Sequence, residues 1–223
     1  MLVACAGVSL PANAADNESG FWAIASTTAA FPDENGASRW RYAIDTQARY
    51  FDFGSGTNQY LIRPSVGYDI GRNATVWAGY ARFHSRNQAG NSSHEDRYWQ
   101  QINWSAGKWN EGALTMRVRL EQRSVSTGDD LGLVLRFMTK YVRPIGTGRT
   151  NLILSLEPFV DLRDTDWSGD SGLGQNRTSV AVGWNASKRV AIEAGYMNQF
   201  IWADSGENRI NHLGVVHFKI NFQ

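Results

Sequence analysis

Cysteine is almost absent from this chain, and its scarcity excludes several kinds of site. The 223 residues include one cysteine, Cys5, so disulfide-stapled scaffolds and metal sites built on thiolates are excluded. Proline is scarce, at 5 residues, and no run of 18 apolar residues occurs that could form a transmembrane helix. The net charge of +1 provides no global field of the kind that attracts nucleic acid.

Glycine and aromatic residues, by contrast, are abundant. The chain contains 22 glycines, and aromatic residues make up 12% of it. Together with the low proline content, this composition favours a large antiparallel sheet over helices. The length is compatible with one β domain, because barrels and sandwiches commonly exceed 200 residues as a single unit.

The N-terminal segment has the character of a secretory leader. Residues 1–15 read MLVACAGVSLPANAA and contain no charge, and Ala12-Asn13-Ala14 matches the small-x-small pattern of a cleavage site. We therefore predict a signal peptide over residues 1–14 and a single mature domain over residues 15–223. No Lys or Arg precedes the apolar stretch, so we expect the leader to be shortened at its start. The alternative is a buried N-terminal strand.

After residue 20 the dominant pattern is alternation with period two, which is typical of β-strands. In residues 114–123 (LTMRVRLEQR), polar residues such as Arg117 and Glu121 lie on one face and apolar residues such as Val118 and Leu120 on the other. The same template predicts strands over residues 21–31, 39–51, 59–70, 74–86, 95–106, 113–126, 131–143, 150–163, 174–186, 189–203 and 209–222. Because bacterial barrels have even strand numbers, we expect that the first segment is irregular or that one further strand exists.

Strand length and the polar face distinguish a membrane barrel from a soluble sandwich. A tilted strand needs about 9–11 residues to cross the hydrocarbon layer, whereas soluble strands cluster near about 5–6 residues. Connections alternate broadly between short turns and longer polar loops, as expected for periplasmic turns and external loops. Aromatic residues gather near strand ends, and residues 217–223 (HFKINFQ) predict a C-terminal strand with Phe218, Ile220 and Phe222 on one apolar face. We therefore predict an all-β, antiparallel transmembrane β-barrel of about 10–12 strands with a charged interior.

Several short motifs resemble those of one known family. They are LIRPSVGY at 61–68, WAGYAR at 77–82, EDRYWQQ at 95–101, RLEQR at 119–123, DLRDTDW at 161–167, QNR at 175–177, GYMNQ at 195–199 and Asn211-His212. In this order and spacing the chain resembles the domain of unknown function 2490 family, grouped with outer-membrane β-barrels. The resemblance covers nearly everything after residue 20. It implies export and a barrel, and it implies no established activity.

The polar residues of these motifs are predicted to form a network inside the lumen. The predicted members are Arg63, Arg82, Glu95, Arg97, Arg119, Glu121, Arg123, Glu157, Asp161, Asp164, Asp166, Gln175, Asn176, Arg177, Gln199 and His212. Both charge signs occur in near balance, as a plugged interior of low dielectric requires. The network is either a structural filling or a selectivity filter for small solutes, and the limited space in a barrel of this size favours the structural filling.

Catalytic and metal chemistry receive little support from the sequence. Ser85, His94 and Asp96 could be grouped as a triad, but residues close in sequence need not form the required geometry. The acidic run 161–170 (DLRDTDWSGD) lacks the spacing of an EF-hand loop, so it is predicted to be a solvated loop or a weak calcium site. We predict no catalytic residue, cofactor or metal.

The sequence as a whole predicts a monomeric barrel exported through the periplasm to the bacterial outer membrane. The expected function is non-enzymatic, either a narrow solute channel or a structural barrel with a polar plugged lumen. The alternative is an enzyme acting on lipid or lipopolysaccharide at the rim, and an adhesin is a third possibility. Outer-membrane lipid, lipopolysaccharide and the barrel assembly machinery are the partners implied by the class, and nucleic acid is not expected.

Overall fold

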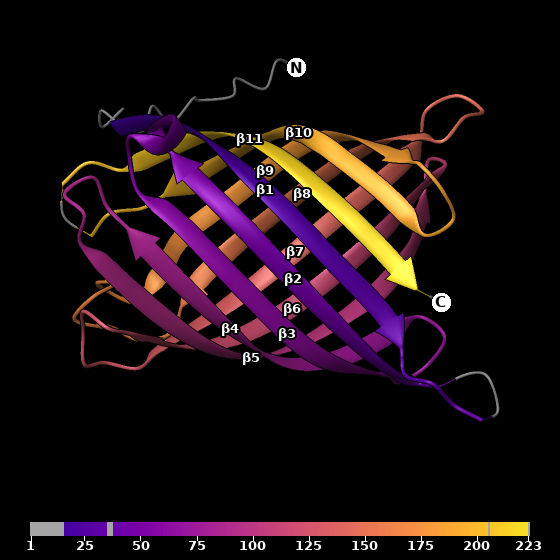
Figure 1. Ribbon diagram of the computed structural model, residues 1–223, viewed down its shortest axis with the longest axis horizontal. Helices are drawn as coiled ribbons and strands as arrows, with labels where there is room; N and C mark the ends of the chain where they lie inside the picture. Colours follow the sequence, from indigo (N-terminus) through magenta and orange to yellow (C-terminus); the bar gives the residue numbers. More distant parts are fainter. Residues whose placement is uncertain (1–15, 35–37, 205, 223) are drawn as a thin grey trace, which may run out of the picture.

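The computed structural model describes residues 16–34, 38–204 and 206–222, and over these residues the chain forms one closed barrel of eleven strands (Figure 1). The strands are β1 (Asp16–Ala30), β2 (Trp40–Phe51), β3 (Asn58–Asp69), β4 (Ala74–Arg86), β5 (Ser92–Trp109), β6 (Gly112–Val125), β7 (Gly132–Pro144), β8 (Thr150–Asp161), β9 (Gly172–Asn185), β10 (Val190–Ile201) and β11 (Arg209–Phe222). The all-β barrel and each predicted strand are confirmed. The largest differences are that β1 begins five residues earlier and β5 extends by three residues at each end. The predicted signal peptide over residues 1–14 lies outside the described residues.

Alternation places most charged side chains inside the barrel, together with small apolar clusters such as Leu61, Ala81 and Phe83, and many large apolar side chains outside. On β6, Arg119 and Glu121 are buried inside the barrel, whereas Leu120 between them belongs to the outer wall. On β8, Glu157 is buried inside, and its neighbour Leu156 is exposed on the outside. This arrangement is the reverse of a soluble core, in which the apolar face would be the buried one.

The barrel closes through a parallel pair. β1 pairs with β11 in parallel, from Asp16 opposite Arg209 to Ala29 opposite Phe222, and every other neighbouring pair is antiparallel. When an odd number of strands alternates in direction, the first and last strands run the same way and must pair in parallel. The expectation of an even strand number is therefore wrong for the described residues, whereas the antiparallel barrel of about 10–12 strands is confirmed, with one parallel pair at its closure. The first segment is a regular barrel strand.

The connections form two unequal rims, which we call the loop rim and the turn rim. The loop rim carries the connections 52–57, 87–91, 126–131, 162–171 and 202–208, and a short 3-10 turn (Asp52–Gly54) lies in the first of these. The turn rim carries 31–39, 70–73, 110–111, 145–149 and 186–189. The expected alternation of short and long connections is present, except that 31–39 is long. The start of β1 lies at the loop rim and the end of β11 at the turn rim (Figure 1).

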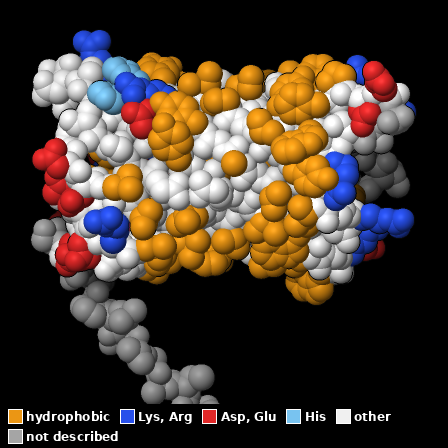
Figure 2. Space-filling model, turned by 90° about the horizontal axis from the view of Figure 1, so that it is seen from below, with side chains coloured by type: hydrophobic (Ala, Val, Ile, Leu, Met, Phe, Trp, Pro, Cys, Tyr) orange, Lys and Arg blue, Asp and Glu red, His pale blue; other side chains and the backbone are white. Residues whose placement is uncertain are grey.

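The outer wall between the rims is apolar. Large hydrophobic side chains such as Ile44, Ile62, Leu156, Val182 and Phe218 are exposed on it. Figure 2 shows hydrophobic side chains distributed along the wall and charged side chains gathered at its two ends. Within the described residues, no helix is long and apolar enough to cross a membrane.

Candidate functional site: a belt across the lumen

A continuous ring of inward-pointing side chains lines the barrel in the half nearer the loop rim. We call this ring the belt, and it is formed by Trp22 (β1), Arg49 (β2), Phe83 (β4), Arg97 (β5), Glu121 (β6), Arg136 (β7), Glu157 and Phe159 (β8) and Arg177 (β9). Ion pairs and cation–π contacts connect the members around the ring, and at β8 the Arg136 guanidinium contacts both Glu157 and Phe159.

Aromatic rings join the cations on one side of the belt. The Arg49 guanidinium carbon lies 4.0 Å from the centroid of the Trp22 ring and 5.3 Å from that of Phe83. The Arg97 guanidinium carbon lies 3.9 Å from the Phe83 centroid, so the same ring contacts a second arginine. A cation held against an aromatic face in a desolvated site gains up to about 2 kcal/mol. Phe83 thus links strands β2 and β5 through two arginines.

Carboxylates join the cations on the other side. Glu121 accepts hydrogen bonds from Arg97 at 3.3 Å and from Arg136 at 2.6 Å, and it also pairs with Arg119 and Arg123 on its own strand. Arg136 in turn donates to Glu157 at 2.7 Å. One carboxylate therefore contacts four guanidinium groups, which makes Glu121 the electrostatic centre of the belt.

Arg177 completes the ring. Its guanidinium carbon lies 4.7 Å from the Phe159 centroid and 4.9 Å from the Trp22 centroid. The Arg136 guanidinium also lies over Phe159, at 4.2 Å. Strands β9 and β1, which β10 and β11 separate in the sheet, are thereby connected across the inside of the barrel.

The side chains of the belt are buried from water. Glu121 is 1% exposed, Phe83 2% and Trp22 3%, although all three point inward. They therefore pack against one another inside the barrel.

Two cavities of opposite charge lie on either side of the belt. The loop-side vestibule, about 330 Å³, is lined by Arg123 and by the carboxylates of Asp161, Asp170 and Asp204. The turn-side cavity, about 340 Å³, has seven cationic and three carboxylate side chains in its described lining. They are Arg49, Arg63, Arg117, Arg136, Arg177, Lys140 and Lys219, against Asp45, Glu157 and Glu193. The charge balance expected from the sequence is therefore absent: the turn-side cavity is strongly cationic.

Most of the predicted network residues lie inside the barrel. Those found there are Arg63, Glu95, Arg97, Arg119, Glu121, Arg123, Glu157, Asp161, Gln175, Arg177 and Gln199. Glu95 extends the belt toward the loop rim, because it accepts from Arg97 at 2.7 Å. Gln199 is buried and accepts from the Asn211 amide at 3.1 Å.

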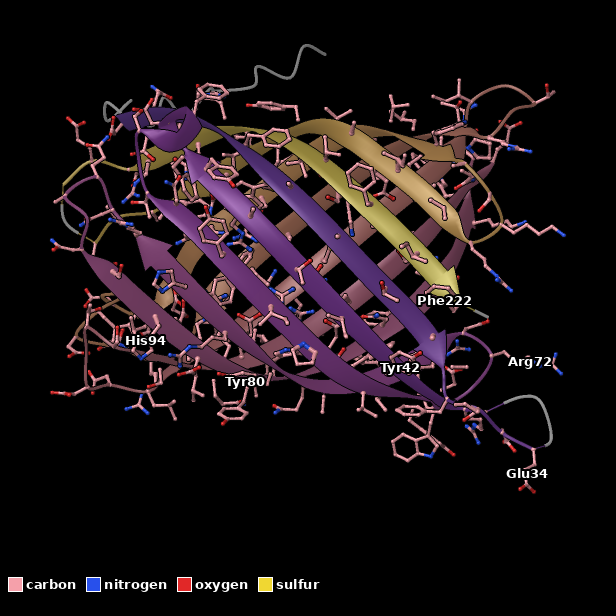
Figure 3. The ribbon with its side chains drawn as sticks, viewed as in Figure 1. Glu34, Tyr42, Arg72, Tyr80, His94 and Phe222 are labelled. Carbon is pink, nitrogen blue, oxygen red and sulfur yellow. The ribbon has the colours of Figure 1, made fainter. Side chains whose placement is uncertain are left out.

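Three predicted network residues lie instead on the outer wall. Arg82 alternates with the buried Ala81 and Phe83, so it points outward, where it pairs with Asp96 at 2.6 Å. Tyr80 also donates to Asp96 and projects away from the barrel (Figure 3). His212 is exposed and its Nδ1 lies 2.6 Å from the Tyr196 hydroxyl. Asn176 is likewise outside the lumen, where it donates to the Thr178 hydroxyl at 3.2 Å.

The last two predicted members, Asp164 and Asp166, belong to a loop. Asp166 accepts hydrogen bonds from the backbone N–H groups of Asp129 and Asp130, which ties connection 162–171 to connection 126–131. Asp164 accepts from the backbone N–H of Ser171 at 2.7 Å. These bonds lower the pKa of both carboxyls below the ordinary value. The predicted lumen role is wrong for both residues, because they stabilise the loop rim.

Sequence reasoning left several lumen residues out of the network. Arg49, Arg117, Arg136, Lys140, Glu193 and Lys219, and the aromatics Trp22, Phe83 and Phe159, were not included. Taking every second residue of each strand as inward-pointing would have found Arg49 and Arg117, which share a face with other polar residues. Arg136 has the apolar residues Val134 and Met138 on its own face, so no alternation of polarity marks it. The aromatics inside the barrel resemble those that face lipid.

The candidate catalytic and calcium groupings do not assemble. His84 and His94 are cross-strand partners on the outer wall, whereas Ser85 points inward. Figure 3 shows His94 close to the loop rim. Among the described residues, no group of three or more His, Cys, Asp or Glu side chains is arranged to hold a metal ion.

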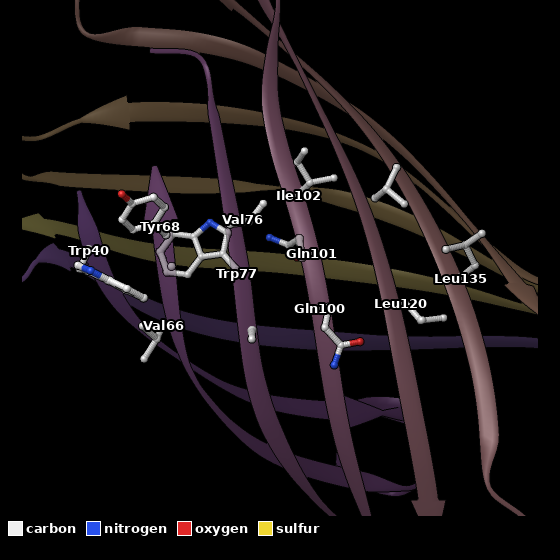
Figure 4. Close-up of a pocket in the computed structure, with 13 residues that line it drawn as sticks. Trp40, Val66, Tyr68, Val76, Trp77, Gln100, Gln101, Ile102, Leu120 and Leu135 are labelled. Carbon is white, nitrogen blue, oxygen red and sulfur yellow. The ribbon is translucent and has the colours of Figure 1, made fainter. Parts of the chain in front are cut away.

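A shallow groove on the outer wall is apolar rather than polar. It crosses strands β2 to β7 and is lined by residues such as Trp40, Val66, Ile102, Leu120 and Leu135 (Figure 4). Its position on the exposed apolar wall makes it part of that wall, with no concentration of polar groups that could orient a substrate.

Comparisons with known proteins point to one family. A family model described as "Protein of unknown function (DUF2490)" matches residues 19–211. An uncharacterised protein of Methylorubrum extorquens is 29% identical over 174 residues, which cover 77% of this chain and 76% of that protein. No solved structure matches the chain.

Proposed function

Starting from the premise that the chain belongs to the DUF2490 family, we propose that it is an integral outer-membrane β-barrel with a closed lumen and a non-enzymatic, structural role. The belt carries this proposal. A general diffusion pore needs a continuous water path, whereas here buried aromatic and ion-paired side chains fill the cross-section. A narrow channel is the second form of the same proposal, and it requires the belt to open.

The outer wall supports the membrane location. Strands of 12 to 18 residues exceed the about 9–11 needed to cross a hydrocarbon layer. Exposed apolar side chains cover the wall between two charged ends (Figure 2). A lipid surface satisfies such a wall, whereas water would make it an aggregation site.

The partners follow from the same argument. The wall would contact outer-membrane lipid, and the loop rim would face lipopolysaccharide. The outward row Phe218, Ile220 and Phe222 on the last strand suits recognition by the barrel assembly machinery. Because the barrel closes on itself without a free sheet edge, we propose that it acts as a monomer.

The membrane location is tested by gel mobility. The chain from Ala15 is refolded in detergent micelles and run in dodecyl sulfate with and without boiling. A closed membrane barrel should migrate differently before and after heating. Equal mobility, together with solubility in the absence of detergent, would contradict the proposal and favour a periplasmic β-protein.

The closed lumen is tested by conductance in planar bilayers. The wild-type barrel should show no steady conductance, and Phe83→Ala should open the belt because it removes the ring between Arg49 and Arg97. Tyr98→Ala is the matched control, since Tyr98 is 62% exposed on the outer wall. Steady conductance of the wild type would show that the lumen is open and would support the channel form instead.

A further inference from the structure

We propose that the turn-side cavity binds a small organic anion that combines a carboxylate with a short hydrocarbon body. This goes beyond a closed structural barrel, because it gives the lumen a ligand. The argument has four steps: uncompensated charge, unpartnered donors, an apolar wall and a route of entry.

The carboxylates of the cavity are already committed to cations. Glu157 pairs with Arg117 and Arg136, Glu193 with Lys140 and Lys219, and Asp45 lies 3.4 Å from Arg63.

Two further arginines, Arg49 and Arg177, line the same cavity. Within the residues that the structure describes, neither Arg49 nor Arg177 makes an ion pair with a carboxylate. A buried cation without a counter-ion is costly, so an incoming anion gains the energy of compensating it.

Buried hydrogen-bond donors point to the same ligand chemistry. The Nε atoms of Arg63 and Arg117 are buried and have no hydrogen-bond partner among the described residues. Both residues line the cavity. Buried polar atoms are nearly always paired, and an ionised carboxylate offers about four acceptor positions. An acceptor-rich ligand would satisfy donors that the protein leaves open.

Part of the remaining cavity wall is apolar, beside the polar residues Gln47, Ser155, Ser179 and His217. Ile24, Met138, Ile153, Met197 and Val215 line it alongside the cations. The volume of about 340 Å³ lies within the range of small-molecule sites, about 300–1,000 Å³. An inorganic anion would leave this apolar wall without a contact, which favours an organic one.

The geometry leaves entry from the turn rim. The belt closes one end of the cavity, whereas Lys140, Glu193 and Lys219 toward the other end have side chains that are 21%, 17% and 22% exposed. Water therefore reaches this end. Two lysines near it would attract an anion and repel a cation.

The test is calorimetric titration of the detergent-refolded barrel with hexanoate, with hexylammonium as the probe of equal length and opposite charge. Hexanoate should bind saturably and hexylammonium should not. Arg63→Gln should weaken hexanoate binding at least tenfold, while Arg143→Gln should leave it unchanged because Arg143 pairs with Glu111 at the turn rim, outside the cavity. Inorganic phosphate should bind more weakly than hexanoate.

Several results would overturn the proposal. They are the absence of saturable hexanoate binding, equal binding of hexylammonium, phosphate binding as tight as that of hexanoate, and an Arg63→Gln barrel that binds hexanoate normally. If Arg63→Gln does not refold, as judged by gel mobility, Lys140→Gln replaces it, because Glu193 keeps Lys219 as a partner. The titration needs only a folded barrel, so its result is independent of conductance.

Discussion

Replacement of Glu121 by glutamine should destabilise the barrel more than any exposed carboxylate replacement. Glu121 is 1% exposed and is the shared partner of Arg97, Arg119, Arg123 and Arg136. At an effective dielectric constant of about 20, its attraction to Arg136 at 2.6 Å is about 6 kcal/mol before desolvation is subtracted. Removing one partner of a buried pair costs about 3–5 kcal/mol, because the other charge stays buried. With four arginines left, we expect the upper part of that range.

The assay is denaturant unfolding of the barrel folded in lipid vesicles. Glu111→Gln is the matched control: Glu111 is 77% exposed and pairs with Arg143 at 3.0 Å, so the change should cost less than about 1 kcal/mol. A second variant, Glu121→Gln with Arg136→Gln, should recover part of the loss, because it removes one of the stranded cations. Equal stability of Glu121→Gln and Glu111→Gln would refute the reasoning, since it would mean that water reaches the belt.

Three further outcomes are expected. Ala23 and Val216 are partners in the parallel pair of β1 and β11, so Ala23→Cys with Val216→Cys should form a disulfide in the folded barrel. Ala23→Cys with Phe218→Cys should not form one, as judged by gel mobility without reductant. Asp166→Asn should increase hydrogen exchange at the amides of connection 126–131. In the wild type, the protection of these amides should persist at neutral pH and be lost only as the pH falls through the lowered pKa of Asp166. A carboxyl whose pKa is lower in the folded state than in the unfolded state stabilises the fold only above that pH range. Single replacements of His84 and His94, which lie on the two strands that flank connection 87–91, should leave lipid turnover unchanged, and loss of a measurable turnover would favour the rim enzyme.

The barrel was largely predictable from sequence because one periodic signal repeats along the whole chain. Strands carry apolar side chains on their outer face, so the alternation of Val118 and Leu120 with Arg117 and Glu121 is visible without any partner strand. The parallel seam was not predictable in the same way. Pairing of β1 with β11 depends on how many strands precede closure, and no local pattern reports that number.

The site was predicted less completely, for two physical reasons. A motif that spans consecutive residues contains both faces of a strand, so Arg82 and Asn176 were grouped with neighbours that point the other way. An aromatic residue is compatible with lipid and with a cation inside the lumen, so Trp22 and Phe83 carried no distinguishing signal. Assigning alternate residues of each strand to the inner and outer faces corrects the first error. Only the three-dimensional contacts reveal the aromatic residues inside the lumen.

The opposite charges of the two cavities give the barrel a permanent electrical polarity along its axis. Carboxylates dominate the space beneath the loop rim and cations dominate the space beyond the belt, so the potential reverses sign across a few layers of side chains. A pore with that profile rectifies: ions of each sign cross more readily from the end that attracts them. A variant with an opened belt should therefore pass unequal currents at opposite voltages. The direction of the larger current would then report which end of the barrel faces which side of the bilayer.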